Sequence, residues 1–465
     1  MTIRTRTTPL AFVPSTDNRV VNDPESNAGQ QELEAKIRTR RAVVGVVGQG
    51  YVGFPLAQRT ARCGFKTFGF DLNGDTVARC EAANTSRRYR AVMTVLALRP
   101  CDVLIVAVPT PTRFSGAAYE PDLTLVVSAV RSLVTHVLDD HRPRLVLIES
   151  TYAPGATRTV VAPIIAEKLP LGEQVFLGYS PERIDPGNQR FQLANTPKIT
   201  SGFDAAAAAL TQLFYSQVVD RAVPASSLEA AEATKILENT FRFINITFAQ
   251  EFDRYCEQAG ISAHEVTQLA ATKPFGFMPF YAGPGIGGHC IAEDPYFLYA
   301  AMREAGSDAP ILQAALANHE GRAQVIVARI ARQLGRPLQG ARILLLGVSY
   351  KPNLGDARRS PAQPIVQLLE AAGATVGYHD PYVATFAERR STDLATADPA
   401  DYDLAVLITR HSDLDYGALA AAGWTIWDAH TSSMQRPTPC GERHPRTLGE
   451  LLHIAKSLHL TEERS

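Results

Sequence analysis

A glycine-rich turn between a predicted strand and a predicted helix constrains the fold of this chain most strongly. Gly48-Gln49-Gly50-Tyr51-Val52-Gly53 follows an apolar run at 42–48 and opens a helical pattern at 51–63. A second apolar run, at 65–71, ends in Asp71. A G-x-G-x-x-G turn in a strand–helix–strand unit, followed about 20 residues later by an acidic residue, is typical of a dinucleotide-binding domain. A tight turn with a purely structural role is the alternative.

The chemistry of this turn predicts which dinucleotide it holds. Glycines at these positions would let a pyrophosphate approach the N-terminus of the following helix. Asp71 would accept hydrogen bonds from ribose hydroxyls, and its charge disfavours a 2′-phosphate. We therefore expect NAD rather than NADP, bound by Gly48, Gly50, Tyr51, Val52, Gly53 and Asp71.

The remaining apolar pattern predicts an α/β protein with two Rossmann-like domains and a helical section between them. Further strands at 101–108, 144–148 and 175–179 are spaced for helical crossovers, which favours a parallel sheet covered on both faces. Strands at 341–347, 375–379, 404–409 and 425–428, with a helix at 362–372, predict a second, smaller domain. We expect a disordered N-terminal extension at 1–40, an NAD-binding Rossmann domain at 41–222, a central helical domain at 223–335 and a C-terminal α/β domain at 336–455.

One helix of unusual length is expected in the central section. Ser226-Ser227-Leu228-Glu229 matches a capping box, and no Gly or Pro occurs again until Gly260. The interval predicts a helix of about 30 residues, roughly 45 Å long at 1.5 Å per residue. Its apolar residues recur on more than one face, so it is expected to be buried between domains or between subunits. We therefore expect a homodimer or a higher homo-oligomer.

Composition gives no support for several classes of partner. The chain has 46 basic and 47 acidic residues, a formal net charge of −1, so nothing favours nucleic acid or an anionic membrane as the main partner. No apolar run reaches the about 18 residues of a spanning helix, and residues 1–40 lack the apolar stretch of a secretory signal. Its six cysteines are scattered without metal-like or disulfide-framework spacing, so we expect no metal site and reduced thiols in the cytoplasm.

The segment 283–295 places a single cysteine, Cys290, at the end of a glycine-rich loop. Glycines without Cβ atoms let the backbone approach a bulky ligand. Asp294 and Pro295 are suited to begin a helix, whose positive end would favour the thiolate of Cys290. We expect a nucleophilic thiol near a carboxylate. An inert buried thiol, and a capping role for Asp294, are the alternatives.

Two polar residues on the long helix are further candidates. Lys235 and Asn239 are four residues apart and therefore share a face. They could hold an oxyanion and a water. Alternatively both could be structural, with Lys235 paired to Glu232 or Glu238 and Asn239 bonded to a loop. Other candidates follow predicted strands, where ligands bind in such sheets; they are Glu182 in the first domain and Lys351, Arg358 and Arg359 in the last.

Seven motifs, in order between residues 43 and 451, make the chain resemble the UDP-glucose/GDP-mannose dehydrogenase family. They are Gly48 to Leu56, Val108 to Thr112, Glu149 to Thr151, Ser180 to Arg183, Glu232 to Asn239, Gly287 to Asp294 and Tyr350 to Pro352. The resemblance implies an NAD-binding Rossmann domain, a central helix used in dimerisation and a C-terminal domain that binds a UDP-sugar.

The resemblance also implies roles for individual residues. Cys290 is implied to be the nucleophile, Lys235 the oxyanion partner, and Asn239 a holder of substrate and water. Asp294 would activate water, with Thr151 and Glu182 assisting. Thr110 and Thr151 are implied to contact the cofactor. The residues implied to contact the substrate are Glu182, Arg183, Lys235, Asn239, Gly287, Lys351 and Arg358.

The activity implied is an NAD-dependent, four-electron oxidation of the sugar C6 hydroxyl to a uronic acid, through a Cys290 thiohemiacetal and thioester. Its product would be a precursor of polysaccharides or glycoconjugates. Pro186 stands where UDP-glucose dehydrogenases usually carry a glutamate, which favours UDP-GlcNAc or UDP-ManNAc. Many members send an arginine into the neighbouring subunit's site, but between Tyr255 and His289 this chain has no arginine, only Lys273.

Three alternatives to this activity stay open. One is a UDP-glucose 6-dehydrogenase. The second is a two-electron dehydrogenase of the 6-phosphogluconate type, which would need neither Cys290 nor a second α/β domain. The third is a nucleotide-sugar sensor without catalytic activity, which would have no use for the thiol.

Overall fold

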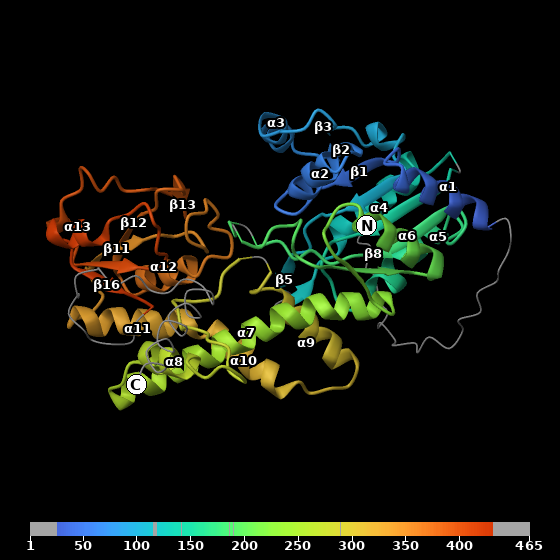
Figure 1. The fold of residues 1–465 in the computed structure, drawn as a ribbon. Helices are drawn as coiled ribbons and strands as arrows, with labels where there is room; N and C mark the ends of the chain where they lie inside the picture. The colour runs from blue at the N-terminus through green and yellow to red at the C-terminus, as the bar shows by residue number, and fades with distance from the viewer. Residues whose placement is uncertain are drawn as a thin grey trace, which may run out of the picture. The chain divides into compact units, whose positions relative to one another are not determined.

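The computed structural model describes residues 26–114, 119–140, 142–185, 187–188, 190–288 and 290–430. Contacts between Cα atoms divide the chain into two compact units. One comprises Met1–Thr240 with Glu293–Ala309, and the other Phe241–Ala292 with Pro310–Ser465. Their elements are labelled in Figure 1.

An eight-stranded sheet forms the centre of the first unit, in the order β10-β9-β8-β7-β4-β1-β2-β3. Its neighbouring strands run parallel except β8 and β9, which are antiparallel. Strands β1 and β4 are adjacent, so the order reverses between them and creates the switch point at which such sheets bind ligands. The strands are β1 (Val43–Val47), β2 (Lys66–Phe70), β3 (Tyr89–Val92), β4 (Val103–Val106), β7 (Arg144–Ile148), β8 (Val175–Tyr179), β9 (Lys198–Gly202) and β10 (Ala222–Pro224).

Both faces of this sheet are covered, as the apolar strands predicted. Val103 and Ile105 of β4 belong to one hydrophobic cluster, whereas Leu104 and Val106 belong to the other, because successive side chains of a strand point to opposite faces. The helices of this unit are α1 (Ser26–Arg38), α2 (Gly53–Arg62), α3 (Gly74–Ala82), α4 (Thr124–His136), α5 (Ala162–Ala166), α6 (Ala205–Ser216) and α9 (Asp294–Glu304). A short hairpin of β5 (Thr112–Phe114) and β6 (Tyr119–Pro121) is added.

Helix α1 corrects part of the predicted disordered extension at 1–40. It packs onto the first unit through Leu33 and Ile37, which are fully buried. These residues are four apart and so share one face of the helix. The Lys36 ammonium also pairs with Asp102 at 2.8 Å. Two apolar residues in a polar segment are too weak a pattern to predict a helix, but the core supplies a surface for them. Residues 1–25 lie outside the described part.

The long helix predicted from residue 226 is α7 (Leu228–Ala259), with 32 residues. Ser227 caps it, because its Oγ accepts the backbone N–H of Ala230 at 3.1 Å. Residues up to Thr240 belong to the first unit and those from Phe241 to the second. The contacts therefore divide the chain within α7. The predicted domain boundaries after residues 222 and 335 stay a prediction.

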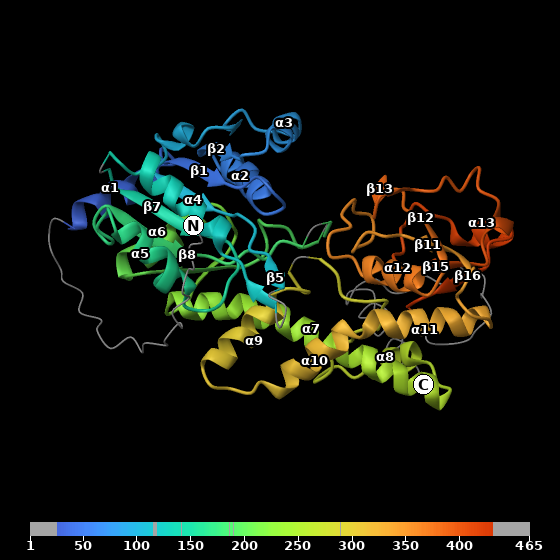
Figure 2. The ribbon, with the colours of Figure 1, turned by 180° about the vertical axis from the view of Figure 1, so that it is seen from behind.

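A four-stranded parallel sheet forms the centre of the second unit, in the order β12-β11-β15-β16. The four strands predicted after residue 335 are confirmed as β11 (Arg342–Leu346), β12 (Thr375–His379), β15 (Leu404–Leu407) and β16 (Ile426–Asp428). Helices α11 (Arg322–Leu334) and α12 (Ala362–Ala371) lie side by side in both views and share one hydrophobic cluster (Figures 1 and 2). The unit also contains α8 (Ala263–Ala271), α10 (Pro310–Glu320) and α13 (Tyr416–Ala421).

Candidate active site

The glycine turn after β1 has the geometry of a dinucleotide cradle. Gly48 has φ +90°, and a Cβ on Gly53 would lie 1.8 Å from the Gly48 carbonyl oxygen, so both positions require glycine. A Cβ on Gly50 would meet no atom within 4 Å. The space over Gly50 is therefore open to a ligand, at the N-terminus of α2, where a pyrophosphate is favoured.

Residues around this turn fit a nicotinamide dinucleotide. Asp71 follows β2, and its Oδ2 accepts the Gln49 N–H at 2.8 Å, which ties it to the turn. Thr110 Oγ1 donates to the Thr151 carbonyl at 2.5 Å and so joins the loops that follow β4 and β7. Tyr51 is 43% exposed and Val52 occupies the N-cap position of α2. The turn would hold NAD, and Asp71 offers a carboxylate for its ribose.

A buried ion pair occupies the carboxyl edge of the same sheet. Lys235 Nζ, on α7, donates to Glu182 Oε1 at 2.5 Å, and the Ile184 N–H donates to Glu182 Oε2 at 2.7 Å. Burial acts to raise the pKa of the Glu182 carboxyl, but the Lys235 ammonium and these hydrogen bonds outweigh it and hold the pKa below its usual value. Glu182 is therefore ionised.

The two partners considered for Lys235 in a structural role are wrong, because it pairs with Glu182 and not with either glutamate of its own helix. Glu238 forms an ion pair with Arg183 instead. Glu232 accepts the backbone N–H groups of Gly155 at 2.5 Å and Thr157 at 2.9 Å. Burial raises the pKa of the Glu232 carboxyl to about 7, although those hydrogen bonds act to lower it.

A second buried carboxylate, Asp294, contacts Asn239, which lies one helical turn after Lys235 on α7. Asn239 Nδ2 donates to Asp294 Oδ2 at 2.5 Å. Helix α9 begins at Asp294, but its N-cap is Glu293, so the capping role considered for Asp294 is wrong. Glu293 Oε2 instead accepts the Thr112 N–H at 3.0 Å. Burial raises the pKa of the Asp294 carboxyl to about 7, although Lys235 and Asn239 oppose the shift.

These four residues are suited to proton transfer. Glu182 and Asp294 are both buried, yet their environments drive their pKa values in opposite directions. Such a split is typical of acid–base sites, because one carboxylate stays ionised while the other can gain and lose a proton near neutral pH. Lys235 and Asn239 add an ammonium and an amide that can stabilise a developing oxyanion.

Sequence analysis missed a buried charged pair behind the Ser180–Arg183 segment. Lys198 Nζ, at the start of β9, lies 3.0 Å from Glu149 Oε1 and donates to the Pro181 carbonyl at 3.1 Å. The Tyr215 hydroxyl donates to the same carboxylate. Burial lowers the pKa of the Lys198 ammonium, against the attraction of Glu149. The sequence around Lys198, Lys-Ile-Thr-Ser-Gly, is mostly polar and gave no signal that this lysine is buried.

The remaining predicted residues belong to the second unit. Cys290 lies in a turn and is exposed, so the burial assumed in the alternative of an inert thiol is wrong. A Cβ on Gly287 would lie 2.8 Å from Tyr350 Cβ, which explains the need for glycine there. Lys351 follows β11 and is partly buried. The Arg358 guanidinium is held by both oxygens of Asp356, at 2.9 and 2.8 Å.

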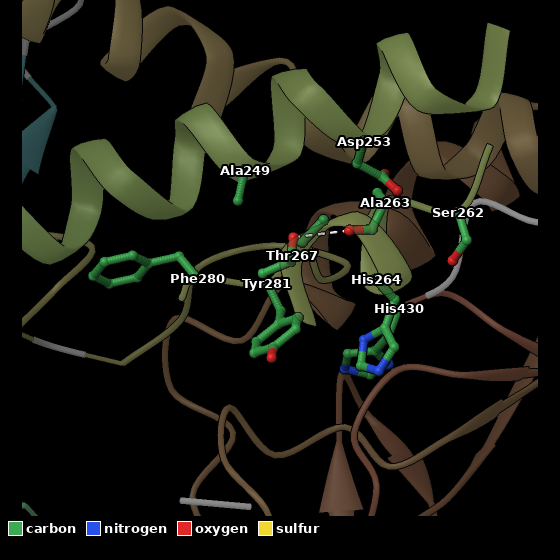
Figure 3. A pocket seen from close by; sticks show the side chains of 10 residues that line it. Ala249, Asp253, Ser262, Ala263, His264, Thr267, Phe280, Tyr281 and His430 are labelled. Atoms are coloured by element: carbon green, nitrogen blue, oxygen red, sulfur yellow. Dashed lines mark hydrogen bonds between the residues drawn. The ribbon is translucent and has the colours of Figure 1, made fainter. Parts of the chain in front are cut away.

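The second unit also contains a pocket (Figure 3). It is lined by Ala249, Asp253, Ser262, Ala263, His264, Thr267, Phe280, Tyr281, Ala282 and His430. Asp253 projects from α7 and accepts a hydrogen bond from Arg329 at 2.7 Å, and the rings of His264 and Tyr281 lie 5.1 Å apart. None of the predicted site residues lines this pocket.

Two further features concern the described residues as a set. No helix among them combines the length and apolar character that crossing a membrane requires. Within the same ranges, no three histidine, cysteine or acidic side chains gather closely enough to hold a metal ion.

Three domain models of one family match this chain in succession. The NAD binding domain of the UDP-glucose/GDP-mannose dehydrogenase family matches residues 79–219, the central domain 229–320 and the UDP binding domain 344–429. A UDP-N-acetyl-D-glucosamine 6-dehydrogenase of Pseudomonas aeruginosa is 33% identical over 391 residues, which cover 80% of this chain and 90% of the relative. A UDP-N-acetyl-D-mannosamine dehydrogenase of Pyrococcus horikoshii is 31% identical, over 73% of this chain and 84% of the relative.

Solved structures show the same relationship. A UDP-D-ManNAc dehydrogenase from Pyrococcus horikoshii aligns with a TM-score of 0.74 at 27% identity, over 86% of this chain and 97% of that one. A UDP-glucose dehydrogenase from Pyrobaculum islandicum aligns with a TM-score of 0.75 at 25% identity, over 84% and 94%. With its dinucleotide cradle and its acid–base pair, this chain belongs to the UDP-glucose/GDP-mannose dehydrogenase family and is an NAD-dependent oxidoreductase.

Proposed function

We propose that this enzyme oxidises the C6 hydroxyl of a UDP-N-acetylhexosamine, UDP-GlcNAc or UDP-ManNAc, to the corresponding uronic acid. The observation that carries the proposal is the buried cluster of Glu182, Lys235, Asn239 and Asp294, in which one carboxylate is ionised and the other has a pKa of about 7. The names of its relatives support the substrate class, since they act on UDP-GlcNAc or UDP-ManNAc. Pro186, the sequence signal for this class, lies outside the described residues.

In the proposed reaction, the buried cluster accepts the proton of the alcohol. Bound NAD supplies the hydride acceptor. Lys235 and Asp294 hold a water that removes the proton from the C6 hydroxyl, and Asp294 can pass that proton on because its pKa lies near neutrality. Asn239 orients the same water through its amide, and Glu182 keeps the Lys235 ammonium in place. Thr151 assists from the loop after β7, where its carbonyl is held by Thr110.

Cys290 carries the second half of the reaction. Its thiolate sulfur forms a bond with the aldehyde carbon, and the carbonyl oxygen becomes the alkoxide of a thiohemiacetal, which Lys235 stabilises. A second oxidation leaves a thioester. Water then attacks the carbonyl carbon, the C–S bond breaks, and the thiolate departs as the carboxylate forms. Water therefore supplies the second carboxylate oxygen, and two NAD are reduced for each sugar.

The nucleotide half of the substrate is assigned to the C-terminal section, 336–455. The family's UDP binding domain matches 344–429 within it. We assign Lys351 and Arg358 to the diphosphate or sugar, as cations near the carboxyl edge of the second sheet. Arg183 and Gly287 complete the proposed contacts. Lys273 is the proposed substitute for the arginine that many members send into a neighbouring site.

We also propose a homodimer that works in the cytoplasm. Four large apolar side chains of α7 are exposed, at 65% for Leu237, 47% for Phe241, 65% for Phe248 and 59% for Tyr255. They are separated by four, seven and seven residues and so form one stripe along the helix. The cytoplasmic assignment rests on the need for a reduced thiol at Cys290.

A screen of NADH release tests the activity. UDP-Glc, UDP-GlcNAc, UDP-ManNAc, UDP-GalNAc and GDP-Man are each supplied with NAD, and NADH and sugar product are counted. We expect two NADH per sugar and a uronic acid from UDP-GlcNAc or UDP-ManNAc. One NADH per sugar with a ketone or aldehyde product would indicate a two-electron dehydrogenase. Tight binding of both ligands without NADH would indicate a sensor.

A further inference from the structure

One carboxylate and one imidazole join three loops at the carboxyl edge of the second unit's sheet. Ser349 follows β11, Asp380 follows β12 and His411 follows β15. The side chains of Asp380 and His411 are fully buried and Ser349 is inaccessible as well. These strands are neighbours in the sheet, so the three loops meet at one edge.

Asp380 is the hub of this arrangement. Its Oδ2 accepts the N–H groups of Val348 at 2.8 Å and Ser349 at 3.0 Å, and its Oδ1 accepts those of Tyr382 at 2.8 Å and Val383 at 3.1 Å. Burial acts to raise the pKa of this carboxyl, but the hydrogen bonds from His411 and the backbone outweigh it and lower the pKa. The hub is therefore an ionised acceptor.

The contacts of His411 assign its tautomer. Nδ1 accepts the Asn353 N–H at 3.0 Å, so it carries no proton. The proton must then lie on Nε2, which is 3.1 Å from Asp380 Oδ2 and donates to it. Although Ser349 Oγ is 3.3 Å from Nε2, this nitrogen has no lone pair for the serine proton. Ser349, His411 and Asp380 are therefore not a nucleophilic triad.

The same contacts fix the turn at 349–353, which carries Lys351. Ser349 Oγ donates to the Lys351 carbonyl at 3.0 Å, and Thr409 Oγ1 donates to the Ser349 carbonyl at 2.6 Å. Asn353 has φ +60°, a conformation that asparagine tolerates better than most residues. Its Oδ1 accepts the Ser412 N–H at 2.9 Å, so both its main chain and its side chain bind the loop of His411.

We propose that His411, braced by Asp380, is a positioning residue for the nucleotide. It holds the 349–353 turn in one conformation, from which the Lys351 ammonium meets the diphosphate of the UDP-sugar. A turn ordered before binding loses less conformational entropy when the ligand arrives, and the affinity rises accordingly. The inference deepens the proposed function and rests on its assignment of Lys351.

His411→Phe tests the proposal in the full-length chain. The phenyl ring keeps the volume and the contact with the Tyr382 ring, 5.1 Å away, but loses both hydrogen bonds. We expect the Kd for UDP, measured by calorimetry, to rise about tenfold or more, as the loss of buried bonds to the turn implies. The Kd for NAD, measured in the same samples, should not change. The KM for the UDP-sugar should rise by a larger factor than kcat falls.

Two conservative variants separate positioning from general stability. In His411→Asn the side-chain oxygen can take the place of Nδ1 and accept the Asn353 N–H, so UDP affinity should recover. In His411→Gln the amide can take the place of Nε2 and keep the bond to Asp380, so affinity should stay low although the hub is intact. Equal affinities for these two variants, at similar melting temperatures, would overturn the proposal even if His411→Phe fails to fold.

A double-mutant cycle tests whether His411 acts through Lys351. Because His411 is proposed to act only through the position of Lys351, His411→Phe should add little to the loss of UDP affinity caused by Lys351→Met. Fully additive losses would overturn it, as would wild-type UDP affinity in a folded His411→Phe variant. A wild-type chain that binds NAD but not UDP would instead overturn the proposed function.

Discussion

At the residue scale, two buried carboxylates of similar intrinsic chemistry differ in pKa because their neighbours differ. Glu182 is compensated by the Lys235 ammonium and a backbone N–H, and it remains ionised. Asp294 accepts a hydrogen bond from the Asn239 amide. Burial outweighs the effects of Lys235 and Asn239, so the pKa of Asp294 rises to about 7. The first is suited to hold a cation and the second to exchange a proton.

The pKa of Asp294 predicts the pH dependence of turnover. The carboxylate form is the base, so kcat should rise about tenfold per pH unit below pH 7 and level off above it. Asp294→Asn should remove both the activity and this acid limb. Because the pKa of Glu232 is also about 7, Glu232→Gln is the matched control and should keep the limb. A flat profile in Glu232→Gln would assign the titration to Glu232.

The buried Lys235–Glu182 pair predicts a specific pattern of stability. Lys235→Met should lower the free energy of unfolding by about 3–5 kcal/mol, because it leaves the Glu182 charge uncompensated. Adding Glu182→Gln should recover most of that loss, since no buried charge then remains. Activity should stay absent in both variants. Denaturant titrations provide the measurement, and equal stability of the single and double variants would argue against a buried pair.

Cys290→Ala separates the two halves of the proposed reaction. Without the thiol no thioester can form, so uronic acid should not accumulate, whereas UDP and NAD should still bind. Product mass spectrometry and calorimetry are the readouts. Formation of uronic acid at a normal rate would show that the sulfur does not take part.

At the scale of elements, the glycines of the β1–α2 turn have two different roles. Gly53 is needed for the chain to fold, whereas Gly50 leaves space for a ligand. Gly53→Ala should destabilise the first unit, because its Cβ would overlap the Gly48 carbonyl. Gly50→Ala should fold with an unchanged Tm, since its Cβ meets no atom, but it should weaken NAD binding. Thermal denaturation and NAD titration check both. Undiminished NAD affinity in Gly50→Ala would place the pyrophosphate elsewhere.

At the scale of the whole molecule, the apolar stripe of α7 predicts the assembly. Phe248→Glu places a charge in the middle of the stripe and should convert a dimer to a monomer, measured by light scattering after size exclusion. Arg242→Glu, also exposed but off the stripe, is the control and should leave the dimer intact. A wild-type monomer, or a dimer that both variants preserve, would refute the proposed interface.

Local patterns in the sequence were sufficient for the long helix and for many of the strands, although not for α1. Alternation of apolar runs predicted β1 and the strands of the second sheet, because buried parallel strands need apolar residues on both faces. The interval free of Gly and Pro predicted α7 almost to its ends, because capping and helix interruption are local effects. The motifs also named Lys235, Asn239 and Asp294 as site residues.

Only the tertiary structure decided which of these residues meet and how they ionise. Helical spacing offered Lys235 two glutamates on α7, yet the fold brings Glu182 to it from 53 residues away. The joining of Asp380 to His411 and the helical state of residues 26–38 likewise depend on surfaces from distant segments. Spacing along the chain determined α7 and the buried strands, whereas burial and long-range partners, which set the pKa of Asp294, exist only once the chain has folded.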